Sequence, residues 1–291
     1  MIPFTKMHGL GNDYVFIDAF ETSDVESHGD LPALARALSD RRFGVGSDGL
    51  IIVAPPGPGC ADADARMIMF NADGSEGAMC GNGLRCVVRL LVERGRTARD
   101  DGVVVVATKS GPRRARVIER DAAWRISVDM GTPAIELAAI PALPDQLEPA
   151  GREGGLDRWR LEGVVGGLVS MGNPHFVSFV EASPEPRKID ALGTRLETHA
   201  AFPHGMNVHF VKVVGPTMAE MVTWERGSGR TQACGTGACA ALVAGVLAGR
   251  LDRSATVCLP GGELEIEWDA GSGRVTMTGP ATEVFRGVWN G

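Results

Sequence analysis

The chain lacks several features on which whole classes of protein depend. Its 291 residues include no apolar run that approaches the length of a membrane span. The first residues, Met1–Lys6, lack the basic-then-apolar pattern of a secretory signal peptide. The net charge is −7, and the basic cluster Arg113–Arg116 fits a solvated strand edge better than a nucleic-acid footprint. We therefore expect a cytoplasmic protein that binds neither a membrane nor a nucleic acid.

The chain also lacks the sequence motifs of a disulfide framework, a metal site and a Schiff-base lysine. Six cysteines without a secretion signal are expected to be thiols rather than a disulfide framework. Cys80 and Cys86 lie close in sequence, as do Cys234 and Cys239, but neither pair has a recognisable second pair of metal ligands. We expect neither a metal ion nor an organic cofactor. Four lysines occur, and none lies in a Schiff-base motif: Lys6, Lys109, Lys188 and Lys212.

What the chain contains instead is a repeated sequence. Ala78–Gly83 and Gln232–Gly237 share a Cys-Gly-x-Gly core, and each runs directly into an apolar helical pattern. A second echo joins Gly11-Asn12 and Gly172-Asn173, each followed by one spacer residue and a ring side chain before an apolar strand. Self-similarity at half-chain distance indicates two copies of one domain.

Periodicity predicts an α+β protein of ordinary globular composition, with 44% hydrophobic and 22% charged residues. Apolar residues at i, i+3, i+4 and i+7 predict helices over 31–38, 84–91 and 239–246. Short runs bounded by turn residues predict about six or seven strands in each half. The halves are expected to join in the Pro- and Gly-rich segment 132–158, some of whose residues could still form strand.

The repeated cysteines suggest acid–base chemistry. A cysteine at a helix start feels the positive end of the helix dipole, which favours the thiolate. The glycines beside it leave backbone N–H groups accessible to a substrate carboxylate. With two such helix starts, a thiolate can remove the proton next to the carboxylate while a thiol protonates the opposite face. This predicts inversion at carbon, at a carboxylate cradled by four backbone positions: Gly81, Asn82, Gly235 and Thr236.

Taken together, the motifs resemble those of diaminopimelate epimerases. The resemblance spans most of the chain, and the motifs occur in the family's order. It implies cofactor-independent interconversion of LL- and meso-2,6-diaminopimelate, in lysine and peptidoglycan precursor synthesis. It rests on six runs: Met7–Asp13, Phe70–Glu76, Cys80–Cys86, Gly172–His175, Glu225–Gly227 and Ala233–Gly237.

The same resemblance implies a fold. It predicts two similar, pseudo-symmetric domains, each a mostly antiparallel β-barrel around a central helix, with the active site in the cleft between them. The first domain would comprise residues 1–130 and be completed by 280–291, and the second would comprise 131–279.

The resemblance also assigns roles position by position. Cys80 and Cys234 match the acid/base cysteines, and His175 and Glu225 match a pair that tunes the thiols. Glu225 also suits the substrate ammonium, and Arg226 suits the distal carboxylate. Gly49 stands where some members carry Gln, so no side-chain contact is available there. The remaining polar contacts to substrate are expected from Asn12, Asn71, Asn173 and Asn207.

Other interpretations stay open. Proline, hydroxyproline and histidine racemases also use paired cysteines, and certain isomerases of this architecture lack them. A thiol redox protein would form a Cys80–Cys234 disulfide during turnover, and inert burial is the ordinary role of a cysteine. A nucleotide-binding module is favoured less, because Gly44-x-Gly46-x-x-Gly49 follows a helix and precedes a strand. For partners we expect a small-molecule substrate and, as an assembly, a homodimer.

Overall fold

The computed structural model describes residues 1–22, 25, 29–97, 101–121 and 124–291. Contacts divide the chain into two compact units. Residues 1–128 and 279–291 form the N-terminal unit, and residues 129–278 form the C-terminal unit. Among the described residues, no helix combines the length and apolar character needed to cross a membrane.

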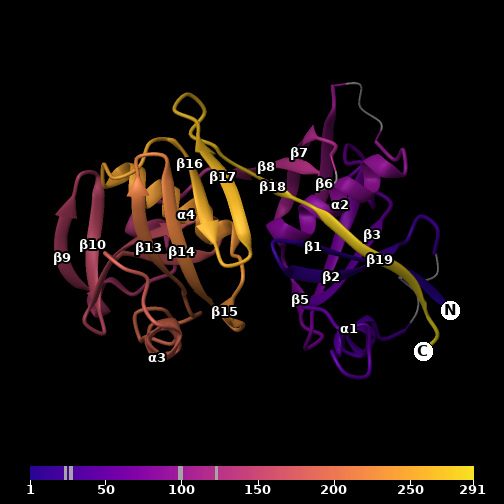
Figure 1. Cartoon of the computed structure of the whole chain (residues 1–291), viewed down its shortest axis with the longest axis horizontal. Coiled ribbons are helices and arrows are strands. Elements are labelled where there is room, and N and C mark those ends of the chain that lie inside the picture. The colour runs from indigo at the N-terminus through magenta and orange to yellow at the C-terminus, as the bar shows by residue number, and fades with distance from the viewer. Residues whose placement is uncertain (23–24, 26–28, 98–100, 122–123) are drawn as a thin grey trace. The chain divides into compact units, whose positions relative to one another are not determined.

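In the N-terminal unit, strands surround helix α2 (Gly81–Glu93) (Figure 1). The helix buries Leu84, Val87, Val88 and Leu91, the positions at which the apolar periodicity predicted its inner face. The other elements are β1 (Ile2–Gly9), β2 (Asn12–Asp18), α1 (Leu31–Ser39), β3 (Gly49–Ala54), β4 (Ala65–Asn71), β5 (Glu76–Gly77), β6 (Val103–Thr108), β7 (Gly111–Glu119), β8 (Arg125–Gly131), which continues into the C-terminal unit, and β19 (Thr282–Trp289).

In the C-terminal unit, helix α4 (Gly235–Leu247) takes the central place among the strands. Every residue from 237 to 245 is buried, so only the ends of this helix approach the surface. The other elements are η2 (Leu137–Ala139), η3 (Pro144–Gln146), β9 (Glu148–Glu153), β10 (Leu156–Leu161), β11 (Val164–Ser170), β12 (Pro174–Phe179), α3 (Pro186–Glu197), β13 (Asn207–Gly215), β14 (Met218–Glu225), β15 (Gly229–Thr231), β16 (Ser254–Leu259), β17 (Gly262–Trp268) and β18 (Val275–Pro280), whose last residues lie in the N-terminal unit.

Strand pairing is the same in both units. In the first, β1–β2 is antiparallel, β2–β3 parallel, β3–β4 antiparallel and β4–β6 parallel. In the second, β11–β12, β12–β13, β13–β14 and β14–β16 repeat that series of directions. The turns before β2 and β12 both need left-handed backbone, at Gly11 (φ 79°) and Gly172 (φ 95°), which explains the repeated Gly-Asn pair. The prediction of two similar α+β halves, each built around one helix, is confirmed.

The segment 132–158 differs from the expectation of a junction. It contributes η2, η3, β9 and the beginning of β10 to the C-terminal unit, and the unit boundary lies between Val128 and Asp129, inside β8. Ile140 and Leu147 are buried in the core of that unit. Proline and glycine in this segment make turns, while its apolar side chains hold it against the core.

Glycine near each helix start allows close packing on a strand. A Cβ atom added to Gly83 would lie 2.4 Å from Ile51 Cδ1, and one added to Gly237 would lie 2.3 Å from His209 Cε1. Ile51 and His209 are the third residues of β3 and β13, so the two contacts are equivalent in the repeat. The rigid ring of His209 can move away from an added Cβ less easily than the terminal methyl of Ile51 can. A side chain is therefore tolerated less well at Gly237 than at Gly83.

We expect Gly237→Ala to destabilise the protein by about 1–3 kcal/mol, because an extra methyl group overpacks a buried site against a ring. Gly215→Ala is the matched control, since a Cβ there meets nothing within 4 Å and the backbone is not left-handed. Denaturant unfolding of both variants measures the difference. Equal midpoints for the two variants would contradict the close packing of α4 on β13.

Candidate active site

Both repeated cysteines are helix N-caps. Cys80 precedes α2 with φ −129° and ψ 119°, and its sulfur accepts a hydrogen bond from the Gly83 N–H at 3.4 Å. Cys234 precedes α4 with φ −121° and ψ 105°. The prediction that each cysteine stands at a helix start is confirmed. Helix geometry directs the first-turn N–H groups outward, at the positive end of the dipole, where an anion binds best.

Asn12 links Cys80 to the rest of its surroundings. Its Oδ1 accepts hydrogen bonds from Cys80 Sγ at 3.3 Å and from Asn82 Nδ2 at 3.2 Å. Its Nδ2 donates to Asp48 Oδ2 at 2.8 Å, which fixes the orientation of the amide. Two residues expected at the site, Asn12 and Asn82, therefore lie beside the sulfur.

Arg85 also contacts this cluster, through Asn82, although sequence reasoning gave it no role. Its side chain is fully buried, and Nη2 donates to Asn82 Oδ1 at 3.0 Å while Nε donates to the Pro280 carbonyl at 2.9 Å. Through these contacts its guanidinium links Asn82, in the first turn of α2, to the C-terminal segment. A buried arginine so placed holds its partners in one geometry.

Tyr14 is a second residue whose role the sequence reasoning missed. It is the chain's single tyrosine, is 5% exposed and interacts through its hydroxyl with Cys80 and Asn12. Burial first, and then the Cys80 sulfur, hold the pKa of Tyr14 well above its ordinary value, so the hydroxyl keeps its proton. The only sequence signal for a role of Tyr14 at the site was the repeat, in which Tyr14 corresponds to His175.

Gly49 and Asn71 pair across β3 and β4. A Cβ at Gly49 would lie 2.2 Å from the Phe70 carbonyl oxygen and 3.0 Å from the Tyr14 ring, so a longer residue would not fit here. Asn71 is exposed, and its Nδ2 donates to Ser75 Oγ at 3.0 Å in the turn after β4. No hydrogen bond found among the described residues joins Asn71 to Cys80.

The surroundings of Cys234 are built from a different set of groups. Its Sγ lies 3.7 Å from Thr236 Oγ1, which accepts a hydrogen bond from Asn173 Nδ2 at 3.4 Å. Asn173 Oδ1 lies 3.0 Å from Nε2 of His175. The sites predicted at Asn173, His175, Cys234 and Thr236 thus form one cluster.

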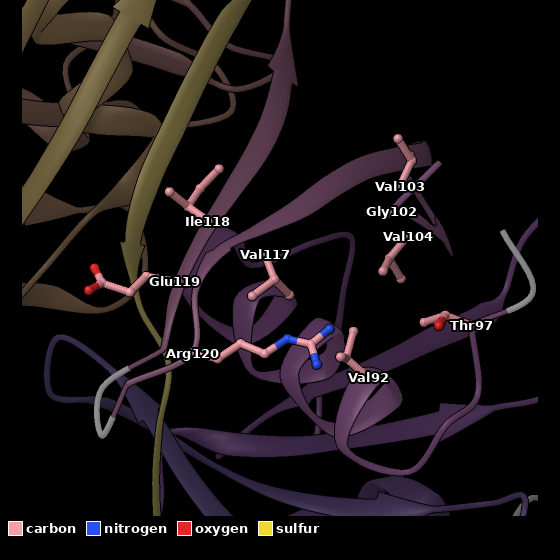
Figure 2. A pocket seen from close by; sticks show the side chains of 9 residues that line it. All are labelled: Val92, Thr97, Gly102, Val103, Val104, Val117, Ile118, Glu119 and Arg120. Atoms are coloured by element: carbon pink, nitrogen blue, oxygen red, sulfur yellow. The ribbon is translucent and has the colours of Figure 1, made fainter. Parts of the chain in front are cut away.

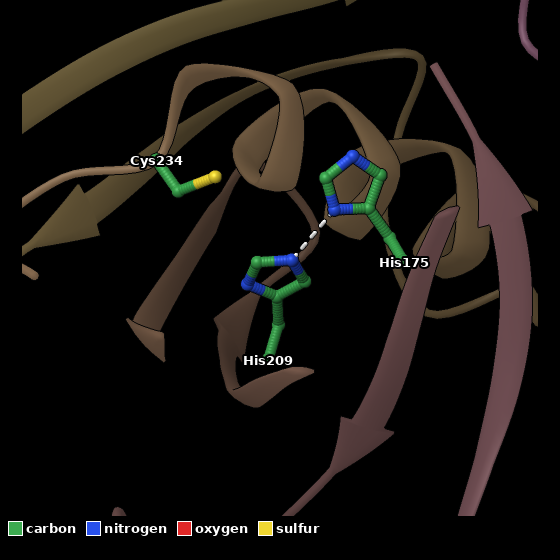
Figure 3. Close-up of side chains that lie close together, drawn as sticks. All are labelled: His175, His209 and Cys234. Atoms are coloured by element: carbon green, nitrogen blue, oxygen red, sulfur yellow. Dashed lines mark hydrogen bonds between the residues drawn. The ribbon is translucent and has the colours of Figure 1, made fainter. Parts of the chain in front are cut away.

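His209 extends this cluster and was missed by sequence reasoning. Nδ1 of His175 lies 2.8 Å from Nε2 of His209 (Figure 3). Nδ1 of His209 lies 2.8 Å from Thr223 Oγ1. Burial lowers the pKa of His209 to about 3, and burial followed by His209 and Arg226 lowers that of His175 well below its ordinary value. Both rings are therefore neutral at neutral pH.

The remaining predicted contacts lie at the end of β14 and the start of β13. Asn207 Oδ1 accepts the Arg226 N–H at 3.1 Å, and Asn207 Nδ2 donates to the Pro174 carbonyl at 2.9 Å. The Arg226 guanidinium donates to the His204 carbonyl at 2.8 Å. Glu225 accepts a hydrogen bond from the Thr231 hydroxyl.

The Cys234 sulfur is a thiol in this environment. Burial is the larger cause that raises its pKa well above the ordinary value, and the Glu225 carboxylate adds to it, while hydrogen bonds from Thr236 and the Gly237 N–H oppose the rise. Cys86 and Cys239, inside the helices, are buried, and burial raises the pKa of Cys86 to about 12. All six cysteines, each within the described chain, are reduced.

A pocket elsewhere in the N-terminal unit is separate from either cysteine. It has a volume of about 220 Å³ and opens beside the end of α2, between β6 and the end of β7 (Figure 2). Its apolar lining comes from Val92, Val103, Val104, Val117 and Ile118, and Glu119 and Arg120 also line it. It contains none of the residues that the repeat singles out.

Sequence comparison identifies close relatives over nearly the whole chain. A family model described as diaminopimelate epimerase matches residues 4–136 and 167–284. The diaminopimelate epimerase of Moorella thermoacetica is 46% identical over 98% of this chain and 98% of that protein. The enzyme of the same name from Acetivibrio thermocellus is 43% identical, over 98% and 97%.

Solved structures show the same fold at low sequence identity. A probable proline racemase from Agrobacterium radiobacter superimposes with a TM-score of 0.66 at 17% identity, over 99% of this chain and 93% of that one. A hydroxyproline epimerase from Agrobacterium vitis gives 0.65 at 18%, over 98% and 90%. The family model and the sequence relatives, rather than these structures, identify the family. The chain belongs to the diaminopimelate epimerase family of isomerases.

Proposed function

We propose that this chain interconverts LL- and meso-2,6-diaminopimelate by two-base proton transfer without an organic cofactor or a metal ion. The observation that carries the proposal is the pair of N-cap cysteines on equivalent, buried central helices. Proline, hydroxyproline and histidine, the alternative substrates, also carry a C–H bond next to the α-carboxylate. Inversion of that carbon needs the same proton transfers, so these substrates differ from diaminopimelate only in the rest of the molecule.

The chemistry needs one sulfur at each face of the α-carbon. One cysteine, as thiolate, takes the α-proton, and the other, as thiol, gives its proton to the opposite face, so the carbon is inverted and the two protonation states are exchanged. N–H groups at Gly81 and Asn82, and at Gly235 and Thr236, are proposed to hold the α-carboxylate and stabilise the negative charge that spreads onto it.

Substrate binding is proposed to help form the thiolate. Cys80 Sγ donates to Asn12 Oδ1, and the pKa of Cys234 is raised by burial and by Glu225. An ammonium group bound at Glu225 would neutralise the carboxylate and so remove one cause of that rise. Tyr14 and the Gly83 N–H are suited to stabilise a Cys80 thiolate by donating to it.

The distal part of the substrate is proposed to select diaminopimelate. Its second carboxylate suits Arg226, whose guanidinium lies at the surface with one hydrogen bond to a backbone carbonyl. Asn173 and Asn207 are proposed to contact the remainder of the substrate, as is Asn71, whose amide lies exposed in its turn.

We expect Cys80→Ala and Cys234→Ala each to lower kcat for epimerisation by about 10²–10⁴-fold, because each removes one of the two proton-transfer groups. A chirality-resolved assay in deuterated water measures both inversion and α-proton exchange. Wild-type protein should act on diaminopimelate and not on proline, hydroxyproline or histidine.

Cys258→Ala is the control for this experiment, since Cys258 is a partly buried thiol outside the repeated motif. Full activity in either active-site variant would refute the two-base reaction. Turnover of proline with no turnover of diaminopimelate would leave the reaction type in place but overturn the substrate.

The pKa of Cys234 can be tested without measuring catalysis. Glu225→Gln removes the negative charge that, after burial, raises the thiol pKa, so the pKa should fall. The sign follows because a neighbouring negative charge disfavours the thiolate. At about pH 8 we expect iodoacetamide to modify Cys234 faster in the variant than in the wild type, because a larger fraction of the sulfur is thiolate.

Peptide mass mapping assigns each modified cysteine. The modification rate of Cys258, whose pKa is raised by burial and then by its own neighbour Glu263, serves as the internal control and should not change. An unchanged or slower rate at Cys234 would count against Glu225 as a group that tunes this thiol.

The domain limits, the compartment and the assembly belong to the same proposal. We propose that residues 1–130 with 280–291, and residues 131–279, are the two halves of one epimerase. A cytoplasmic location is proposed because a reducing compartment keeps both thiols available.

A homodimer is proposed because β19 exposes three apolar side chains: Val284, Phe285 and Val288. Sedimentation velocity at micromolar concentration should give the mass of two chains. Val288→Glu should shift that equilibrium toward the monomer, and a wild-type monomer would contradict the dimer.

A further inference from the structure

Three metal-binding side chains converge inside the C-terminal unit. Cys234 Sγ and one ring nitrogen from each of His175 and His209 all lie within 4.8 Å of one another, and all three residues are buried. They come from three elements, the start of α4, β12 and β13, and Figure 3 shows the sulfur directed toward the two rings. The cysteine spacing did not reveal this set, because its other ligands lie 59 and 25 residues before Cys234 in the sequence.

The outer nitrogens of both histidines already have the partners that metal-bound histidines need. Nε2 of His175 faces Asn173 Oδ1 at 3.0 Å, and Nδ1 of His209 faces Thr223 Oγ1 at 2.8 Å. Such contacts fix the orientation of an imidazole and direct its other nitrogen to the ion. The two inner nitrogens, Nδ1 of His175 and Nε2 of His209, face one another at 2.8 Å.

We propose that His175, His209 and Cys234 form a binding site for Zn²⁺ or a similar borderline-soft divalent ion, such as Co²⁺. Two imidazoles and one thiolate are the ligand set that such ions prefer, and they leave a fourth position for water. Hard ions such as Mg²⁺ and Ca²⁺ prefer oxygen ligands and would not compete.

Binding requires small movements and one proton release. A tetrahedral zinc ion bound at about 2.0–2.1 Å holds two nitrogens about 3.3 Å apart, so the rings must separate by about half an ångström and the sulfur must approach them. The S–H bond of Cys234 breaks, a metal–sulfur bond forms, and the proton leaves to solvent. The proton shared between the rings moves to Nδ1 of His209, where Thr223 Oγ1 accepts it.

The consequence for activity rests on the proposed function. If Cys234 transfers protons to and from substrate, a metal ion bound to its sulfur occupies the lone pair that accepts the proton. Zinc should therefore inhibit epimerisation reversibly. Metal binding itself does not depend on that function, so a binding measurement stays informative even if the chain has another activity.

The experiment uses full-length, reduced, chelator-treated protein titrated with Co²⁺. We expect one ion per chain, with the near-ultraviolet absorption that marks transfer of charge from thiolate to cobalt, and displacement by Zn²⁺. His209→Gln should weaken binding by more than about 100-fold, because even loss of an outer hydrogen-bond partner costs about 10–100-fold. Cys234→Ala should abolish the absorption.

Thr223→Val provides a milder test in case His209→Gln unfolds, and should weaken binding by about 10–100-fold. Cys80→Ala and Cys258→Ala should bind cobalt like the wild type. The proposal is overturned if wild-type protein shows no thiolate–cobalt absorption, if His209→Gln and Thr223→Val both bind with wild-type affinity, or if the absorption disappears in either cysteine control.

Discussion

The structure depends on one constraint, the burial of a central helix in each unit. Because strands surround α2 and α4, and α4 is buried from residue 237 to 245, little beyond the helix ends can meet a ligand. At the N-terminal end, helix geometry leaves outward-directed N–H groups, and both helices place a cysteine there as the N-cap. The sulfur, the donors for a carboxylate and the favourable dipole therefore coincide at one point of each unit.

The two units use this shared framework with different chemistry. Around Cys80 the neighbours are amides and a hydroxyl, from Asn12, Asn82 and Tyr14. Around Cys234 they are imidazoles and a carboxylate, from His175, His209 and Glu225. Equivalent positions have diverged, since Ile51 in β3 corresponds to His209 in β13. A duplicated scaffold has thereby acquired two unlike thiol environments, which suits the proposed reaction, in which the two sulfurs take opposite protonation states.

Local patterns predicted most of the framework because their physical causes are local. A Cys-Gly-x-Gly segment before an apolar helical period specifies a helix start, and the left-handed backbone at Gly11 and Gly172 requires glycine. Segment 132–158 packs against the C-terminal unit through buried Ile140 and Leu147, a contact that its turn-forming composition does not reveal. Arg85, Tyr14 and His209 received no role, since a single polar residue within an apolar pattern has no local signature of its partners.

By itself, the sequence determined the duplication, the α+β class and the two cysteines at helix starts, because these follow from order and spacing along the chain. It also indicated the family, through the resemblance of its motifs. Only the tertiary structure decided which side chains surround each sulfur. Strand pairing places His209 beside His175 across β12 and β13, and the packing of Gly237 sets α4 on His209. Protonation and metal affinity depend on burial and on distances of a few ångströms between residues far apart in sequence, so they arise only when the strands and helices pack.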